Sequence, residues 1–343
     1  MPETRNWALD VAVFACAFGV VLAMTPLARK ISRKAGAIDY PRERGMHDEP
    51  MPRMGGIAIV LGFLAAVAVA AFFMPEMRTG QFIGFIAGAL LIAATGMLDD
   101  IFTLRARHKF ALQIVAALIV VFSGTRVEFV QYPLHAYLDY FSIPFTLVWI
   151  VGLTNAVNLI DGLDGLAAGV SAIGAVCLMV LCVFSGNALA AALSAALAGS
   201  CLGFLPRNFN PAEVIMGDTG ALFLGYVLAV SSITGVFKAY ALLSVLLAFL
   251  ALALPIFDTL FAMIRRAFRH KPLMEADRGH LHHRLVDSGY SPKQAVVILY
   301  GLSAVTGVMA IVIAMKEARA IVVTLICVAV MLMMVYVYRR RTK

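Results

Sequence analysis

Apolar runs of about 20 residues recur along almost the whole chain, and they constrain the fold more than any other feature. Such a length is what a helix needs to cross the hydrocarbon core of a bilayer. Of the 343 residues, 62% are hydrophobic and 14% are charged, whereas soluble domains carry about 25% charged residues. The pattern predicts an all-α, polytopic membrane helical bundle that forms one domain over residues 1–343.

We predict eleven spans, or ten if the sixth and seventh are one helix, because only Ser185-Gly186-Asn187 separates those two. The predicted spans lie near residues 7–29, 55–74, 80–98, 110–123, 143–161, 165–186, 187–206, 220–237, 240–264, 294–315 and 319–338. The first is too long for a removable signal peptide and lacks a cleavage-site pattern.

Lysine and arginine gather in alternate loops, and this sets the predicted orientation. With the N-terminus outside, all but six of the 28 basic residues lie on the cytoplasmic side, as the positive-inside rule requires. The exceptions are Arg5, Arg78, Arg126, Lys238, Lys316 and Arg319. Topology therefore explains most of the net charge of +8, and we infer no nucleic-acid partner. The five cysteines lie inside apolar runs without metal-ligand spacing and are predicted to be core residues.

Acidic residues and histidines gather on the same predicted side, which a rule about Lys and Arg does not explain. Six of the seven histidines lie there, as do all but six of the 20 Asp and Glu residues. They fall in five elements, near residues 30–54, 99–109, 158–165, 207–219 and 265–293. We therefore predict a catalytic face on the cytoplasmic side, with the C-terminus on that side too.

The stretch NAVNLIDGLDGLAAG, residues 155–169, carries an amide or a carboxylate at every third position. These positions are Asn155, Asn158, Asp161 and Asp164. Residues i and i+3 are neighbours on a helix, but each such step falls about 60° short of a full turn. All four can meet only if the helix tightens or ends near Gly162 and Gly165. A helix cap is the alternative for any single one of them.

Asp99 and Asp100 end the third predicted span. Adjacent helical residues point about 100° apart, so the two need not act as a pair. A solvated pair at the membrane boundary is one explanation. The basic residues Arg105, Arg107 and Lys109 favour another, in which a divalent cation bridges phosphates and basic groups take the remaining negative charge.

Met216-Gly-Asp-Thr-Gly220 directly precedes an apolar helix. Asp218 or Thr219 could simply cap that helix. Alternatively, Asp218 is a carboxylate held near a metal and phosphates, with Gly217 and Gly220 allowing the backbone close to them.

His280-Leu-His-His283 is a second concentration of polar groups. Imidazoles commonly bind zinc, but no cysteine accompanies them, and Arg278 and Arg284 would repel a dication. Phosphate recognition by His and Arg suits the segment better.

Together these motifs resemble the polyprenyl-phosphate N-acetylhexosamine-1-phosphate transferases, relatives of the phospho-N-acetylmuramoyl-pentapeptide transferases. Each motif is weak alone, but the ordered set is specific and covers almost the entire chain. The resemblance implies a multi-pass protein of the bacterial inner membrane. It also implies transfer of a sugar phosphate from a UDP-N-acetylhexosamine to undecaprenyl phosphate, with UMP released and Mg²⁺ required, Mn²⁺ being a potential substitute. Such a step starts O-antigen, common-antigen or teichoic-acid synthesis; whether the chain forms a homodimer stays open.

The resemblance also implies roles for individual residues. Those implied as catalytic are Asp99, Asp100, Asp161 and His280. Those implied as metal ligands are Asp218, Asn158 and Asp161. Those implied to bind substrates are Asn158, Asp164, Asn210, His47, Arg53, Lys109, Arg278, His282 and His283. For Asp99 two roles remain, because a lipid phosphate with a second pKa near about 6 is largely deprotonated at neutral pH. Asp99 is either a general base or a group that positions the acceptor.

Two details bear on the donor. The pattern His-x-His-His-Arg-Leu resembles the GlcNAc-1-phosphate branch, which favours UDP-GlcNAc over UDP-MurNAc-pentapeptide. Ile215 stands where relatives usually have Phe, which removes an aromatic candidate for stacking on uracil, and Ala221 stands where many have Ser.

Two other functions remain as alternatives. A membrane metallohydrolase that cleaves lipid diphosphates would need the same acids and histidines. A secondary transporter would also be polytopic, but its binding residues would be expected near the bilayer midplane, with repeat symmetry between halves.

Overall fold

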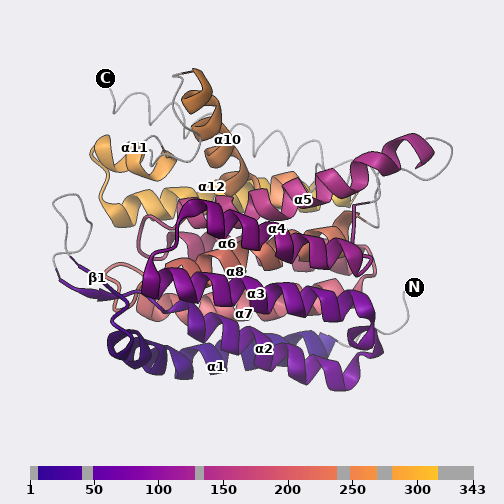
Figure 1. Cartoon of the computed structure of the whole chain (residues 1–343), viewed down its shortest axis with the longest axis horizontal. Helices are drawn as coiled ribbons and strands as arrows, with labels where there is room; N and C mark the ends of the chain where they lie inside the picture. The colour runs from indigo at the N-terminus through magenta and orange to yellow at the C-terminus, as the bar shows by residue number, and fades with distance from the viewer. Residues whose placement is uncertain (1–6, 41–48, 128–134, 238–247, 269–279, 316–343) are drawn as a thin grey trace.

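The computed structural model describes residues 7–40, 49–127, 135–237, 248–268 and 280–315. Within them, long helices lie roughly side by side along the longest axis of the molecule (Figure 1). The helices are α1 (Trp7–Lys34), α2 (Gly56–Phe73), α3 (Gly80–Phe102), α4 (Ala106–Phe122), α5 (His135–Ile160), α6 (Leu166–Phe184), α7 (Ala188–Asn208), α8 (Gly217–Ser232), α10 (Ala253–Phe268), α11 (Leu281–Asp287) and α12 (Pro292–Ala314). A 3₁₀ turn, Pro75–Arg78, precedes α3, and a π-helical turn, Ile233–Phe237, extends α8.

Eight helices of the described part are long and apolar enough to cross a membrane, which confirms the predicted all-α polytopic class. They cover Trp7–Lys34, Gly56–Phe73, Gly80–Phe102, Tyr140–Ile160, Leu166–Phe184, Ala188–Asn208, Gly217–Gly235 and Pro292–Ala314. The predicted span 110–123 is helical but belongs to a helix of 17 residues. In the predicted span 240–264, residues 248–251 are helical and residues 253–264 belong to α10, whereas residues 240–247 lie outside the described residues. The predicted span 319–338 also lies outside them.

Local signals explain where several helices begin and end. Gly186 adopts a positive φ of 73° after α6, and the Asn187 side chain accepts a hydrogen bond from the backbone N–H of Ala190 to begin α7. The sixth and seventh predicted spans are therefore separate helices. Thr79 caps α3 in the same way, and Ser291 begins α12 with a capping box shared with Gln294.

Helix α8 is enclosed by the bundle. Every residue of α8 except Asp218 is buried, and α3 and α5 pack along it. A helix that is apolar on all sides belongs in the interior of a bundle. The one side chain of α8 that reaches solvent is thus a carboxylate at its first turn.

A short pairing between distant segments positions that first turn. Strands β1 (Ile38–Asp39) and β2 (Met51–Pro52) form an antiparallel pair. Beyond β2 the chain runs beside the start of α8, where Ile215 N–H donates to the carbonyl of Pro52 at 2.8 Å. Gly56 N–H donates to the carbonyl of Met216, also at 2.8 Å. The segment after β2 therefore fixes the entry into α8.

The polar motifs come from element ends that meet at one end of the bundle. These are the C-terminal ends of α3 and α5 and the N-terminal ends of α4, α6 and α8. In Figure 1, β1 and α11 lie toward this same end, at the left. Helix α11 lies inside the predicted loop 265–293 and was not predicted, because seven residues are too few to show a helical period.

Candidate active site at one end of the bundle

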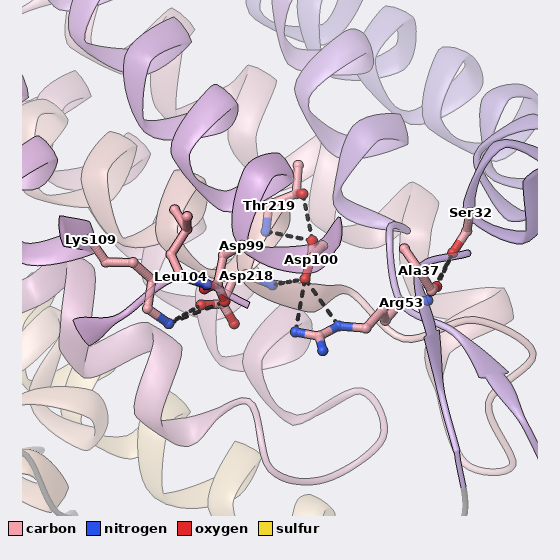
Figure 2. Close-up of polar contacts among 9 residues, drawn as sticks. All are labelled: Ser32, Ala37, Arg53, Asp99, Asp100, Leu104, Lys109, Asp218 and Thr219. Atoms are coloured by element: carbon pink, nitrogen blue, oxygen red, sulfur yellow. Dashed lines mark hydrogen bonds and ion pairs between the residues drawn. The ribbon is translucent and has the colours of Figure 1, made fainter. Parts of the chain in front are cut away.

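Asp99, in the last turn of α3, binds the start of α4. Its Oδ1 accepts a hydrogen bond from the backbone N–H of Leu104 at 2.7 Å, and its Oδ2 accepts one from Lys109 Nζ at 3.2 Å (Figure 2). The Asp99 side chain is 5% exposed. Both oxygens of this carboxylate therefore already have a donor.

Lys109 joins Asp99 to a second helix. Its Nζ also donates to Asp218 Oδ2 at 2.8 Å, so one ammonium lies between two carboxylates that are 119 positions apart in the chain (Figure 2). Charge-assisted hydrogen bonds of this length are among the stronger polar contacts in proteins. The contact holds the first turn of α8 against the junction of α3 and α4.

Asp100 has a different set of partners, as the angle between adjacent helical residues predicted. Its oxygens accept from the N–H of Asp218 at 3.0 Å, and from the N–H and Oγ1 of Thr219 at 3.0 and 2.6 Å (Figure 2). Arg53 Nε and Nη2 lie 3.3 and 3.2 Å from Asp100 Oδ1. The first N–H groups of a helix have no intrahelical acceptor, so Asp100 caps α8 from α3. Its side chain is fully buried.

Gly217 makes this close packing sterically feasible. Its φ is +70°, and a Cβ at this position would lie 1.9 Å from the carbonyl oxygen of Arg53 and 2.7 Å from both carboxylate oxygens of Asp100. Any side chain here would force α8 away from its cap. The glycine before Asp218 is therefore required by packing against Arg53 and Asp100, a reason that the sequence motif did not predict.

The segment between α5 and α6 carries the polar residues spaced by three. Helix α5 ends at Ile160, two residues before Gly162, and Gly165 has a φ of +79° before α6 begins, so the helix ends near the predicted glycines. Asn155 does not join the others: its amide pairs with Gln113 of α4 and donates to the carbonyl of Val151 at 2.8 Å. It ties α5 to α4 one turn below the site.

Asp164 binds the loop that leads to α8. Its Oδ2 accepts from Asn210 Nδ2 at 3.3 Å and from the backbone N–H of Ala212 at 3.1 Å. Asn208 adds a second tie, accepting from Gly165 N–H at 3.1 Å and donating to the carbonyl of Val214 at 3.0 Å. The turn after α5 and the loop before α8 thus form one polar unit.

Asn158 and Asp161 differ from the other polar residues of the site. Within the described residues, neither side chain has a hydrogen-bond partner, and both are half-buried. Loss of solvation raises the pKa of Asp161 to about 8, and repulsion by the carboxylates of Asp218, Asp100 and Asp164 adds to the shift. Asp161 is therefore a carboxyl group near other carboxylates, and no cation binds it in the described part of the chain.

The histidine motif covers this turn. His282 packs so closely on Gly162 that a Cβ there would lie 2.4 Å from His282 Nε2, which is enclosed and has no hydrogen-bond partner in the described part of the chain. Burial, together with repulsion from His283, lowers the pKa of His282 to about 4. The rings of His280 and His282 stack at 5.8 Å, and those of His282 and His283 lie 4.2 Å apart. The three histidines of this motif therefore lie together, with His282 against the turn that contains Gly162.

Sequence reasoning missed Asp258 on α10. This buried carboxylate lies 2.9 Å from His280 Nδ1 and accepts from Leu281 N–H at 2.8 Å. A signal did exist, because an acidic residue inside a predicted span is a functional candidate by default. Two predicted residues, His47 and Arg278, lie outside the described residues.

The oxygen-rich donor set suits a hard divalent cation such as Mg²⁺. Among the described residues, no three His, Cys, Asp or Glu side chains converge on one metal position. The positive charge between Asp99 and Asp218 is the Lys109 ammonium, which takes the place that a cation would have between two carboxylates. Asp218, Asp161 and Asn158 could bind such an ion, because the last two have no hydrogen-bond partner among the described residues and Asp218 reaches solvent.

Comparison with known proteins agrees with this geometry. Residues 82–236 match the model of glycosyl transferase family 4, a stretch that contains most of α3 and all of α4 to α8. A probable undecaprenyl-phosphate N-acetylglucosaminyl 1-phosphate transferase of Bacillus subtilis is 38% identical over 306 residues, which is 88% of this chain and 84% of the relative.

Two further relatives are also similar over most of their length. A decaprenyl-phosphate N-acetylglucosaminephosphotransferase of Mycolicibacterium smegmatis is 36% identical over 308 residues, covering 80% of this chain and 75% of the relative. A phospho-N-acetylmuramoyl-pentapeptide-transferase of Listeria monocytogenes is 30% identical over 323 residues, covering 88% of this chain and 97% of the relative. With identity at this level over most of both chains, this protein belongs to glycosyl transferase family 4.

Proposed function

We propose that this protein transfers N-acetylglucosamine-1-phosphate from UDP-N-acetylglucosamine to a polyprenyl phosphate, with undecaprenyl phosphate as the simplest acceptor. The observation that carries the proposal is the 38% identity to the Bacillus subtilis relative over 84% of its length. The carboxylate cluster at one end of the bundle supports it, because a phosphoryl transfer needs charged groups there and little covalent chemistry from the protein.

The proposed reaction has one displacement. An oxygen of the lipid phosphate attacks the β-phosphorus of the UDP-sugar, a new P–O bond forms, and the bond to the α-phosphate oxygen breaks to release UMP. Both reactants are anionic, so their repulsion is the first obstacle. Arg53 and Lys109 lie at the site and provide positive charge, and Arg278 of the same motif set is a further candidate.

We propose Mg²⁺ as the cofactor, with Mn²⁺ as a substitute, held by Asp218, Asp161 and Asn158. When bound, it supplies positive charge that offsets the charge of the diphosphate. Asp161 would then exist as a carboxylate, although its pKa is about 8 in the protein alone. Asn158 would contribute a neutral oxygen beside it, one helical turn earlier.

For Asp99 we favour positioning over a role as general base. Its two oxygens accept from Leu104 N–H and Lys109 Nζ, and such bonds stabilise a carboxylate that holds neighbouring groups. If Asp99 removed a proton from the acceptor, Asp99→Asn would lose less activity at pH 8.5 than at pH 6, because the phosphate is already deprotonated at the higher pH. We expect equal losses at both values.

We further propose a location in the bacterial inner membrane, with the N-terminus outside and both the C-terminus and the site on the cytoplasmic side. The gathering of Lys and Arg in loops of one side supports this orientation. A polyprenyl chain would stay in the bilayer, and its phosphate would reach the bundle end that carries Asp99 and Asp218. The product would start a cell-surface polysaccharide, such as O-antigen, common antigen or teichoic acid.

Transfer of radiolabelled sugar by detergent-purified protein tests the proposal. UDP-GlcNAc and undecaprenyl phosphate are supplied with Mg²⁺ or with EDTA, beside the variant Asp218→Ala. A matched control is Glu213→Gln, which removes an exposed carboxylate five positions earlier that binds Arg29 and Arg207. We expect lipid-linked sugar and UMP in equal amounts from the wild type and the control, and none with EDTA or in Asp218→Ala.

Other products would identify other functions. Lipid product from UDP-MurNAc-pentapeptide but not from UDP-GlcNAc would correct the donor only. Release of inorganic phosphate from a lipid diphosphate, without sugar transfer, would establish the hydrolase instead. Folded protein that gives neither product from any nucleotide sugar would refute the transferase and favour a transporter.

A further inference from the structure

Asp258 lies on the protein-facing side of α10. Six large apolar residues of that helix are exposed, namely Phe257, Leu260, Phe261, Met263, Ile264 and Phe268. The side chain of Asp258 points inward and is 7% exposed. A carboxylate in such an apolar setting is costly unless its oxygens are bound. The groups that bind the Asp258 carboxylate therefore indicate the role of this residue.

Each carboxylate oxygen of Asp258 has a separate donor. Oδ1 accepts from the backbone N–H of Leu281 at 2.8 Å, and Oδ2 lies 2.9 Å from His280 Nδ1. Leu281 is the first residue of α11, and His280, which precedes it, makes no capping bond through its own side chain. Asp258 therefore fixes both the backbone and the imidazole of the same short segment.

This arrangement sets the tautomer of His280. An ionised carboxylate can only accept a hydrogen bond, so Nδ1 must carry the proton. The other ring nitrogen, Nε2, lies on the far edge of the ring and, within the described residues, has no hydrogen-bond partner. A carboxylate at Nδ1 also stabilises the charged ring when Nε2 takes up a proton.

The His280 ring is part of the stack of histidine rings that lies against the turn containing Asp161. His280 stacks on His282, and His282 lies against Gly162. We propose that Asp258 is a positioning residue for the transfer reaction, holding His280 so that Nε2 faces the phosphate oxygens of the substrates. This inference rests on the proposed function, and it gives α10 a role in the site that no motif assigned to it.

The variant Asp258→Asn tests the inference with little change in shape. Its amide oxygen can still accept from Leu281 N–H, but its NH₂ group must then face His280 Nδ1. The ring would reverse its tautomer and lose the adjacent negative charge. We expect kcat to fall by on the order of 10- to 100-fold, as for other partners that orient a functional histidine, with KM for both substrates changed by less than about threefold.

Two controls separate positioning from folding. Asp287→Asn removes an exposed carboxylate from the same α11 and is expected to keep wild-type kcat. In a His280→Ala background, Asp258→Asn should lower kcat by less than about twofold further, because a residue that acts through His280 has nothing left to position. Losses that multiply in the double variant would overturn the inference, as would an unchanged kcat in Asp258→Asn.

The tautomer itself gives a readout that a purely structural role would not move. With ¹⁵N-labelled histidine, the His280 signals are those that disappear in His280→Ala, among seven histidines in all. We expect the neutral ring to carry its proton on Nδ1 in the wild type and on Nε2 in Asp258→Asn. The same tautomer in both proteins would refute the inference. Absence of sugar transfer by the wild type would instead refute the proposed function, and the tautomer measurement would still stand.

Discussion

Two neighbouring regions of the site differ in whether the protein itself binds their carboxylates. At the junction of α3, α4 and α8, every oxygen of Asp99 and Asp100 has a donor from the protein, and Lys109 and Arg53 provide positive charge. At the turn between α5 and α6, Asp161 has no such partner among the described residues. The carboxylates of the junction are thus bound by the protein itself, whereas we propose that Asp161 at the turn binds a metal ion. Residues of the first kind should support stability, and those of the second kind should support activity.

Asp161→Asn should separate activity from stability most clearly. We expect sugar transfer to fall by on the order of 10³-fold, because a charge used in binding and catalysis is lost. The melting temperature in detergent should stay level or rise, since the variant removes a carboxyl group that its carboxylate neighbours repel. Transfer assays and thermal melts on one preparation measure both quantities. A large fall in melting temperature would show that Asp161 supports stability, as the residues of the junction do, and would contradict the difference between the two regions.

Asp100→Asn should show the reverse behaviour. An amide at this place directs an NH₂ group at donors that include Arg53 and the N–H of Thr219. Leaving a buried charge without its partner costs about 3–5 kcal/mol, and we expect a melting temperature lower by on the order of 10 °C.

Thr219→Ser is the matched control for Asp100→Asn, because it keeps the hydroxyl that donates to Asp100 at 2.6 Å. It should melt within about two degrees of the wild type. If Asp100→Asn lost activity at an unchanged melting temperature, Asp100 would be a reacting group and not the cap of α8.

Lys109→Met tests whether the junction needs its ammonium. Without it, Asp99 and Asp218 repel each other, and we expect melting in EDTA several degrees below the wild type. Added Mg²⁺ should raise the melting temperature of the variant more than that of the wild type, because the ion can then take the place between the carboxylates. An equal effect of Mg²⁺ on both proteins would mean that Lys109 and the ion do not share this place.

His282 gives the smallest expected effect, and it depends on pH. Its pKa of about 4 lies below the ordinary value of about 6.5, so between these values the unfolded chain binds a proton and the folded protein does not. The free energy of unfolding therefore keeps its full value above pH 6.5 and falls as the pH drops toward 4, by up to about 1.4 kcal/mol for each pH unit.

The wild type should therefore lose more melting temperature between pH 7.5 and pH 5 than His282→Gln does. His108→Gln, at an exposed histidine of α4, serves as control and should follow the wild type. Parallel curves for His282→Gln and the wild type would show that the ring is solvated.

The sequence predicted those parts of the site that depend on local geometry. The angle between adjacent helical residues indicated that Asp99 and Asp100 need not act as a pair. The spacing by three indicated that the polar residues could meet only if α5 tightened or ended near Gly162 and Gly165, and α5 does end at Ile160. The apolar runs likewise indicated most of the long helices.

Partners far apart in the chain could not be read in this way. The bond from Arg53 to Asp100 spans 47 positions, and that from Asp258 to His280 spans 22. Asn155 looked like one of four equivalent residues, yet it pairs with Gln113, because the side of α5 that faces α4 is set by packing. No local pattern encodes which helix will become the neighbour of another.

The tight fit of Gly217 between Arg53 and Asp100 has a consequence for how the protein is made. The space at the start of α8 is lined by residues of α3 and of the segment after β2. These residues leave the ribosome more than a hundred residues before Gly217. Until Gly217 and Thr219 arrive, Asp100 has neither the backbone nor the hydroxyl donors that it binds in the finished protein. This part of the candidate site therefore forms late in biogenesis, and a chain that stops before α8 leaves the Asp100 carboxylate without these donors.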